Sequence, residues 1–163
     1  MNRPAVACVG LGGNLGDVAA TLRAAIAALA ALPETRLLRA SRFYRTPPWG
    51  VEAQPGFVNA AVALETGLAA RTLLDGLLRI ERDSGRVRDA DDRWGPRTLD
   101  LDLLLYGAAV VDEPGLRVPH PHLHERAFAL IPLLDVLPDA VIPGIGPARE
   151  ALAGLDAVVI EPL

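Results

Sequence analysis

Two aspartates, Asp100 and Asp102, stand one residue apart in the segment RWGPRTLDLDLLLYG, residues 93–107. Side chains alternate across a strand, so both carboxylates would lie on one face, about 7 Å apart at a rise of ~3.3 Å per residue. The opposite, buried face would carry Leu99, Leu101, Leu103 and Leu105. Two carboxylates at this separation suit a pair of Mg²⁺ ions, which lie about 3.5–4 Å apart in two-metal sites. The alternative is a half-exposed sheet whose polar face meets water.

The segment before this acid pair is rich in arginine. Arginine binds phosphate through paired hydrogen bonds and keeps its charge at neutral pH. Because metal ions bridge phosphate oxygens and guanidinium groups neutralise the remaining charge, a diacid beside arginines suits a Mg²⁺-triphosphate. Acidic residues are interspersed, so a solvated, salt-bridged loop remains an alternative. The arginines are Arg79, Arg82, Arg86, Arg88, Arg93 and Arg97.

The three histidines, His120, His122 and His124, favour a different chemistry if they lie on a strand. All three would then share one face, and neutral imidazoles at that spacing could bind zinc, as in a metal-dependent hydrolase. However, Pro119 and Pro121 interrupt the run. Pro121 fits the first turn of a helix, on which His122 and His124 would point apart.

The common nucleotide-binding motifs do not match. All 16 basic residues are arginine, and a P-loop requires a lysine. The segment GLGGNLG has Gly10 and Gly12 in the dinucleotide pattern, but Leu15 stands where the third glycine belongs. We therefore interpret this segment as a tight turn between a strand and a helix.

Composition limits the class of protein. A chain of 163 residues with 51% hydrophobic residues predicts a single globular domain, residues 1–163. The net charge of −4 argues against a general nucleic-acid binder. No apolar stretch is long enough to span a membrane, and the N-terminus lacks a signal pattern. The one cysteine, Cys8, excludes an internal disulfide and fits an inert core thiol in the cytoplasm.

Hydrophobic periodicity and chain breakers predict the elements that position these residues. We predict strands at 4–10, 37–45, 57–65, around Asp100, and at 157–161, with a hairpin at 109–111 and 116–118. Helices are predicted at 18–32, 69–83, 122–134 and 147–155, and loops rich in proline, glycine or charge at 46–56 and 84–93. The first six elements follow the order βαββαβ. The expected fold class is α+β, a ferredoxin-like core with additional C-terminal helices and short strands.

Five blocks in this order resemble the 6-hydroxymethyl-7,8-dihydropterin pyrophosphokinase family over nearly the whole chain. They are FYRTPPWG, QPGFVNAAVALET, GRVR, RWGPRTLDLD with the following LLLYG, and VPHPHLHERAFAL. The resemblance implies an ATP-dependent transferase that moves pyrophosphate from ATP to the hydroxymethyl group of a reduced pterin and releases AMP, in folate biosynthesis. It also implies small-molecule substrates, and we expect a monomer. A non-enzymatic ferredoxin-like binding domain is the third alternative, beside the hydrolase.

The resemblance also implies roles for individual residues. Asp100 and Asp102 would bind two Mg²⁺ ions and, with Arg86 and Arg97, form the catalytic group. The ATP site would comprise Glu81, Arg86, Arg88, Arg97, His120 and Arg126. The pterin site would comprise Thr46, Pro47, Phe57, Asn59, Trp94 and Phe128. Arg117 stands where the family has a smaller residue and is left out of the site, and Glu125 stands where asparagine is frequent.

Overall fold

The computed structural model describes residues 3–46, 56–84, 98–155 and 160–163. Its core elements are β1 (Ala5–Gly13), α1 (Val18–Ala30), β2 (Thr35–Ala40), β3 (Tyr44–Thr46), β4 (Phe57–Thr66), α2 (Ala70–Asp83) and β5 (Asp100–Tyr106). The remaining elements are β6 (Val111–Glu113), β7 (Leu116–Val118), the 3₁₀ turn η1 (Leu123–Glu125), α3 (Ala127–Val136), β8 (Val141–Ile142), β9 (Gly146–Pro147), α4 (Ala148–Ala153) and β10 (Glu161–Pro162).

One antiparallel sheet is the centre of the molecule. Its strand order is β10-β3-β4-β1-β5, and β2 also pairs with β4. The first strand therefore lies between β4 and β5, the strands before and after α2, as expected for a βαββαβ fold. The α+β class and the ferredoxin-like core are confirmed.

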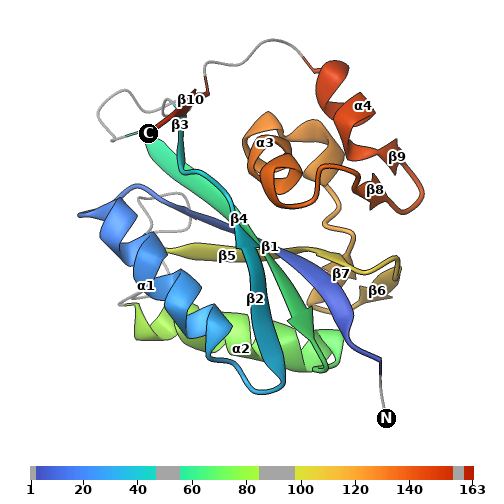
Figure 1. Cartoon of the computed structure of the whole chain (residues 1–163), viewed down its shortest axis with the longest axis horizontal. Coiled ribbons are helices and arrows are strands. Elements are labelled where there is room, and N and C mark those ends of the chain that lie inside the picture. Colours follow the sequence, from blue (N-terminus) through green and yellow to red (C-terminus); the bar gives the residue numbers. More distant parts are fainter. Residues whose placement is uncertain (1–2, 47–55, 85–97, 156–159) are drawn as a thin grey trace.

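Each face of the sheet is covered by a different set of helices (Figure 1). α1 and α2 cover one face, where their leucines pack on Val9, Leu11, Leu101 and Leu103. α3 and α4 cover part of the other face and pack on Cys8, Ala61, Ala63, Leu104 and Leu105. The two clusters divide the alternating side chains of the same strands, as expected for a sheet between two layers.

Cys8 is a core thiol, as predicted. It is fully buried, and burial raises its pKa to about 12. A thiol needs its ionised form to act as a nucleophile, so Cys8 is unreactive in the fold.

The predicted strand at 37–45 is two strands, β2 and β3, both paired with β4. The break falls at Ser41, whose N–H donates to the carbonyl of Ala61 (2.8 Å) while its Oγ accepts from the N–H of Ala61 (2.8 Å). A serine hydroxyl thus replaces a backbone acceptor, which lets the chain turn without leaving a buried N–H unpaired. Periodicity alone does not reveal this substitution.

The glycine-rich segment is not the predicted turn. Gly10, Gly12 and Gly13 belong to β1, which continues beyond the predicted end at residue 10. The turn comes afterwards, where Gly16 has a positive φ of 68° and Asp17 caps α1 by accepting from Ala20 N (3.1 Å).

A β-bulge changes the faces of the acidic strand. Val9 pairs with Leu103 and Cys8 with Leu105, so Leu104 is the extra residue of β5. Before the bulge the predicted alternation holds, with Leu101 and Leu103 in the core beneath α1 and α2. After it, Leu105 packs on the opposite side, with Leu104. Assigning Leu105 to the face of Leu101 was wrong, because an extra residue inverts a two-residue period.

The C-terminal part is broken more finely than predicted. The helix expected at 122–134 is the turn η1 followed by α3, which accommodates Pro132 in its interior. The hairpin β6–β7 agrees with the prediction, whereas the hairpin β8–β9 was not predicted. The final strand is Glu161–Pro162, and residues 157–159 of its predicted range lie outside the described residues.

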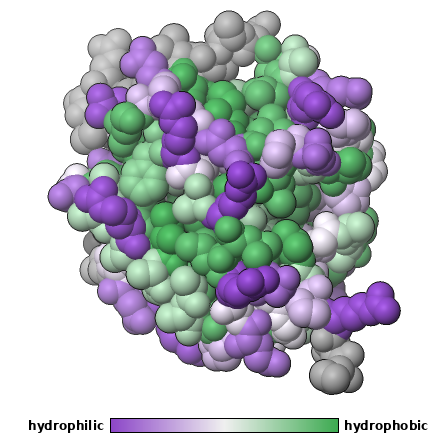
Figure 2. All heavy atoms as spheres, viewed as in Figure 1, coloured by the Kyte–Doolittle hydropathy of each residue, from purple (hydrophilic) through white to green (hydrophobic). Residues whose placement is uncertain are grey.

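The surface is mixed in character. On the face shown in Figure 2, hydrophobic residues gather near the middle and are edged by hydrophilic ones. Among the described residues, no helix has both the length and the apolar character needed to span a membrane.

Candidate active site

The acid pair lies on the sheet face that carries α3. Asp100 is half-buried and Asp102 is exposed. Their strand pairs with β1, in which Gly12 lies opposite Asp100 and Gly10 opposite Asp102. A Cβ on Gly10 would lie 3.2 Å from the side chain of Leu104, so this glycine makes room for Leu104.

Gly12 separates the acid pair from Asn59. Gly12 pairs with Asn59 of β4 on one side and with Asp100 of β5 on the other. Since neighbouring strands lie about 4.8 Å apart, the backbones of Asp100 and Asn59 are roughly 10 Å apart across Gly12. A Cβ on Gly12 would lie 2.8 Å from Oδ1 of Asn59, closer than real contacts allow. Only glycine therefore fits beneath this amide.

Asn59 is held by its neighbours. Its Nδ2 donates to Oγ1 of Thr46 at 3.2 Å, and the Thr46 hydroxyl donates to the carbonyl of Phe57 at 3.5 Å. The exposed fraction is 9% for Asn59 and 5% for Thr46. Thr46 pairs with Phe57, and Phe57 lies two residues before Asn59, so all three side chains are on the same face. A fixed amide beside an aromatic ring suits a flat heterocycle with polar edges.

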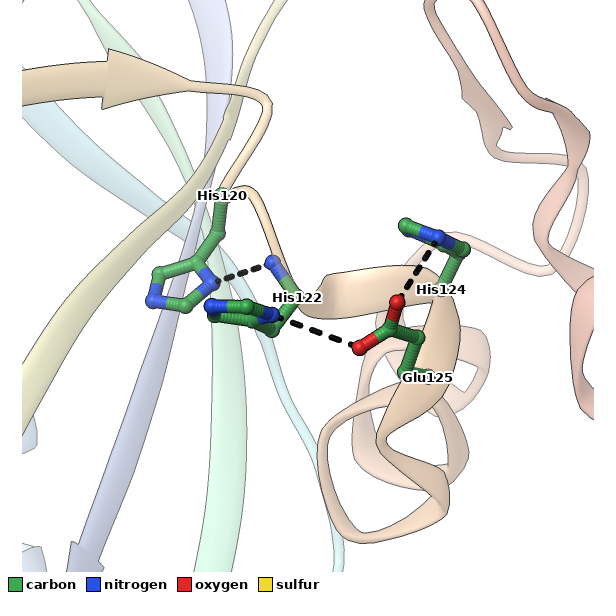
Figure 3. A network of polar contacts seen from close by, with 4 residues as sticks. All are labelled: His120, His122, His124 and Glu125. Carbon is green, nitrogen blue, oxygen red and sulfur yellow. Dashed lines mark hydrogen bonds and ion pairs between the residues drawn. The ribbon is translucent and has the colours of Figure 1, made fainter.

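His120 lies near Asp102, two residues after the end of β7 (Figure 3). Its N–H donates to the carbonyl of Leu104 at 3.0 Å. Its Nδ1 accepts from the N–H of His122 at 3.2 Å, so the proton of the neutral ring is on Nε2. Burial lowers the pKa of His120, against the attraction of Asp102, and the charge of Arg126 lowers it further. His120 is thus a neutral donor near Asp102.

His122 and His124 lie on either side of Glu125 (Figure 3). Nδ1 of His122 is 3.3 Å from one oxygen of Glu125, and Nε2 of His124 is 3.4 Å from the other. Both histidines thus face the Glu125 carboxylate. In the described residues, no group of three His, Cys, Asp or Glu side chains could hold a metal ion. The zinc alternative is not supported, because His122 and His124 both face Glu125, whereas Nδ1 of His120 accepts from the backbone of His122.

Arg126 and Phe128 come from the start of α3. The guanidinium carbon of Arg126 lies 5.7 Å from the ring centroid of Phe128, within the range of a cation–π contact. Both side chains are half-buried.

A cavity of about 640 Å³ opens beside Asp102. It is lined on one side by β5, including Asp102, and on the other by the β6–β7 hairpin and His120. The hairpin contributes Asp112, Glu113 and Arg117. Arg117 is paired with Asp112 at 3.1 Å, and Arg71 is paired with Glu113 at 3.0 Å. Sequence reasoning did not include these hairpin residues, and only the pairing of β6 with β7 brings them to Asp102.

The chain matches the model of one family over residues 8–138, described as 7,8-dihydro-6-hydroxymethylpterin-pyrophosphokinase. It is 50% identical over 155 residues to a 2-amino-4-hydroxy-6-hydroxymethyldihydropteridine pyrophosphokinase of Methylorubrum extorquens, covering 95% of this chain and 96% of the relative. It is 48% identical to the Pseudomonas aeruginosa protein of the same name, covering 95% and 94%.

The chain belongs to this pyrophosphokinase family. It is a transferase, and its activity is pyrophosphate transfer in folate biosynthesis. The hydrolase and the non-enzymatic binding domain are not supported. Enzymes that use ATP generally act with Mg²⁺.

Solved structures agree with the pyrophosphokinase fold. The wild-type Plasmodium falciparum HPPK-DHPS with pteroate matches with a TM-score of 0.73 at 12% identity, covering 94% of this chain. This chain spans 44% of that longer chain. At this identity the likeness concerns the fold alone.

The structure brings most of the expected pyrophosphokinase site residues to one sheet face. Those from the described residues are Thr46, Phe57, Asn59, Asp100, Asp102, His120, Arg126 and Phe128. Glu81 differs, because it lies in α2 on the opposite side of the sheet, where its carboxylate accepts from the backbone of β5. Pro47, Arg86, Arg88, Trp94 and Arg97 lie outside the described residues. Gly12 was missed as a site residue, and a glycine inside an apolar strand was the signal that could have found it.

Proposed function

We propose that the chain transfers the terminal two phosphates of ATP to 6-hydroxymethyl-7,8-dihydropterin on the sheet face between Asn59 and Asp102. The observation that carries this proposal is the row Asn59, Gly12, Asp100 across three paired strands. An amide that can recognise a pterin edge and a carboxylate that can hold a metal ion face the same space. The hydroxymethyl group and the reacting phosphate would meet above Gly12.

The pterin half of the proposal uses the fixed Asn59. One N–H of its Nδ2 is donated to Thr46, so Oδ1 can accept from an N–H on the pterin edge and the second N–H can donate to an acceptor there. Phe57 and Phe128 supply aromatic surfaces from β4 and α3, which suit a flat ring. Pro47 and Trp94 complete this half in the proposal, on the resemblance of their motifs.

The nucleotide half uses the cavity beside β5. Its lining combines Asp102 and His120 with the apolar Leu101, Leu103 and Leu116, a mixture that suits a base attached to a charged chain. Neutral His120 would donate from Nε2 to a phosphate oxygen. Arg126, and Arg86, Arg88 and Arg97 from outside the described residues, would neutralise the remaining phosphate charge.

Asp100 and Asp102 fit Mg²⁺ as a donor set. They are hard oxygen ligands on one face, and Mg²⁺ characteristically takes one or two carboxylates with the rest of its ligands from water and phosphate. Two bound ions are part of the proposal. When bound, they would neutralise charge on the phosphates.

The reaction requires position and charge stabilisation more than a strong base. The pterin hydroxymethyl oxygen forms a bond to the β-phosphorus of ATP, and the bond from that phosphorus to the oxygen shared with the α-phosphate breaks. AMP leaves with that oxygen, and the hydroxyl proton passes to solvent or phosphate. Phosphoryl transfer of this kind depends mainly on orientation and electrostatic stabilisation.

We also infer that the chain acts as a single domain and a monomer in the cytoplasm. Cys8 is a buried thiol that suits a reducing compartment. Size-exclusion chromatography with light scattering measures the mass of the protein in solution and tests the oligomeric state.

An AMP-release assay with ATP, Mg²⁺ and 6-hydroxymethyl-7,8-dihydropterin tests the function. Asp102→Asn should lower turnover by at least about 100-fold, because a neutral amide is a poor ligand for a hard dication. Asn59→Ala should raise the KM for the pterin by at least about tenfold while ATP binding is kept. The exposed Asp83→Asn is the matched control and should behave as the parent. Pterin-dependent AMP release that is unchanged in Asp102→Asn contradicts the proposal.

A further inference from the structure

Glu81 is a carboxylate on the buried face of a helix. It lies in α2 on the same side as Leu73, Leu77 and Ile80, and only 4% of it is exposed. Burying a carboxylate is costly unless it is hydrogen-bonded. Packing alone does not explain a glutamate at this position, since an apolar residue would fill the same space.

One contact of this carboxylate is with the backbone of the acidic strand. Oε2 of Glu81 accepts the N–H of Leu101 at 3.0 Å. That N–H belongs to the peptide unit between Asp100 and Leu101, and Asp102 follows directly. β5 pairs with β1 on its other side, so Glu81 binds the edge of β5 that β1 does not use.

The contact fixes the strand where the two aspartates emerge from it. Leu101 faces the core beneath α1 and α2, whereas Asp100 and Asp102 face the opposite side. An acceptor on the Leu101 N–H restrains rotation of the peptide plane, and with it the directions of the Cα–Cβ bonds on both sides. Groups that orient metal ligands commonly change metal affinity 10–100-fold when they are removed.

We propose that Glu81 is a positioning residue that holds Asp100 and Asp102 in the geometry for metal binding. Glu81 is 4% exposed and its Oε2 binds the backbone of β5, so we assign it to this strand and not to the ATP site that the resemblance implies. The inference rests on the proposed role of the two aspartates in binding Mg²⁺.

The test measures metal-dependent binding apart from turnover. The probe is α,β-methylene ATP, in which the bond that must break is not cleavable, titrated by calorimetry with Mg²⁺ and with EDTA. In Glu81→Ala, the gain in affinity that Mg²⁺ provides should fall by at least tenfold, and the Mg²⁺ concentration for half-maximal AMP release should rise. Glu81→Gln retains an oxygen acceptor and should recover most of both.

Leu77→Ala is the matched control, because Leu77 is fully buried on the same face of α2. It should lower the unfolding temperature while leaving the Mg²⁺-dependent gain within about twofold of the parent. If Glu81→Ala is folded and keeps the gain, or if Glu81→Gln loses it as fully as Glu81→Ala, the positioning role is wrong. Asp102→Asn separates the two ideas: if it too keeps the Mg²⁺-dependent gain, the proposed metal site itself has failed.

Discussion

At the residue scale, the most constrained position of the site is a residue without a side chain. Asp100 could be chosen from the chemistry and spacing of its side chain, and Asn59 from the motif that resembles the family. Gly12 was missed, since its one signal in the sequence is that of a glycine inside an apolar strand. The reason for the glycine becomes clear only when the register of β1 with β4 and β5 is known.

Gly12→Ala should therefore impair pterin binding selectively. The new Cβ would lie 2.8 Å from Oδ1 of Asn59, so the amide must move by several tenths of an ångström. We expect kcat/KM for the pterin to fall about 10–100-fold, because displacement of a substrate-positioning group has effects of this size. Affinity for α,β-methylene ATP should change less than threefold. Gly67→Ala is the control, since its Cβ would make ordinary contacts of 3.5 Å; equal losses in both variants would contradict the local explanation.

At the element scale, the sequence predicts helices and strands well where one period runs unbroken. The apolar spacing of Leu73, Leu77 and Ile80 predicted α2, and its end at Asp83 is as expected. Prediction was poorer where a single residue interrupts a period, as at Ser41 and at the bulge on Leu104. In both cases a hydrogen bond or an extra residue, which no periodicity records, decides the local structure.

Ser41→Ala tests that explanation for the break between β2 and β3. The variant removes the acceptor of the buried Ala61 N–H, and an unpaired buried donor costs about 1–3 kcal/mol of unfolding free energy. Urea denaturation measures this loss. Ser84→Ala is the control: its hydroxyl donates to the Ile80 carbonyl, which also accepts the N–H of Ser84, so we expect a loss below about 0.5 kcal/mol. A Ser41→Ala variant as stable as the control would show that the hydroxyl is not needed for the break.

At the scale of the whole molecule, the site depends on how α3 sits on the sheet. Arg126 and Phe128 lie at the start of α3, and Thr46 lies at the end of β3. The proposed site therefore requires α3 and β3 to stay in contact. Tyr44 of β3 donates its hydroxyl to Oδ2 of Asp135 in α3 at 2.5 Å, and the N–H of Arg42 donates to the same oxygen at 3.3 Å. The sequence predicted a strand at 37–45 and a helix at 122–134, but not the contact of Tyr44 with Asp135, because residues 91 apart give no periodic signal.

The hydrogen bond between Tyr44 and Asp135 should make the stability of the protein fall at high pH. Burial, followed by the hydrogen bond to Asp135, raises the pKa of Tyr44 to about 12 from an ordinary value near 10. Above about pH 10 the unfolded chain loses the Tyr44 proton while the folded chain keeps it, so unfolding becomes easier up to about pH 12. Tyr44→Phe lacks this proton and should be less stable than the parent at pH 8. The difference between the two should then shrink, by at most about 2–3 kcal/mol, as pH rises from 10 to 12. Urea unfolding of both proteins at each pH measures it, and a difference that stays constant across this range would mean that the Tyr44 hydroxyl titrates alike in the folded and unfolded chains.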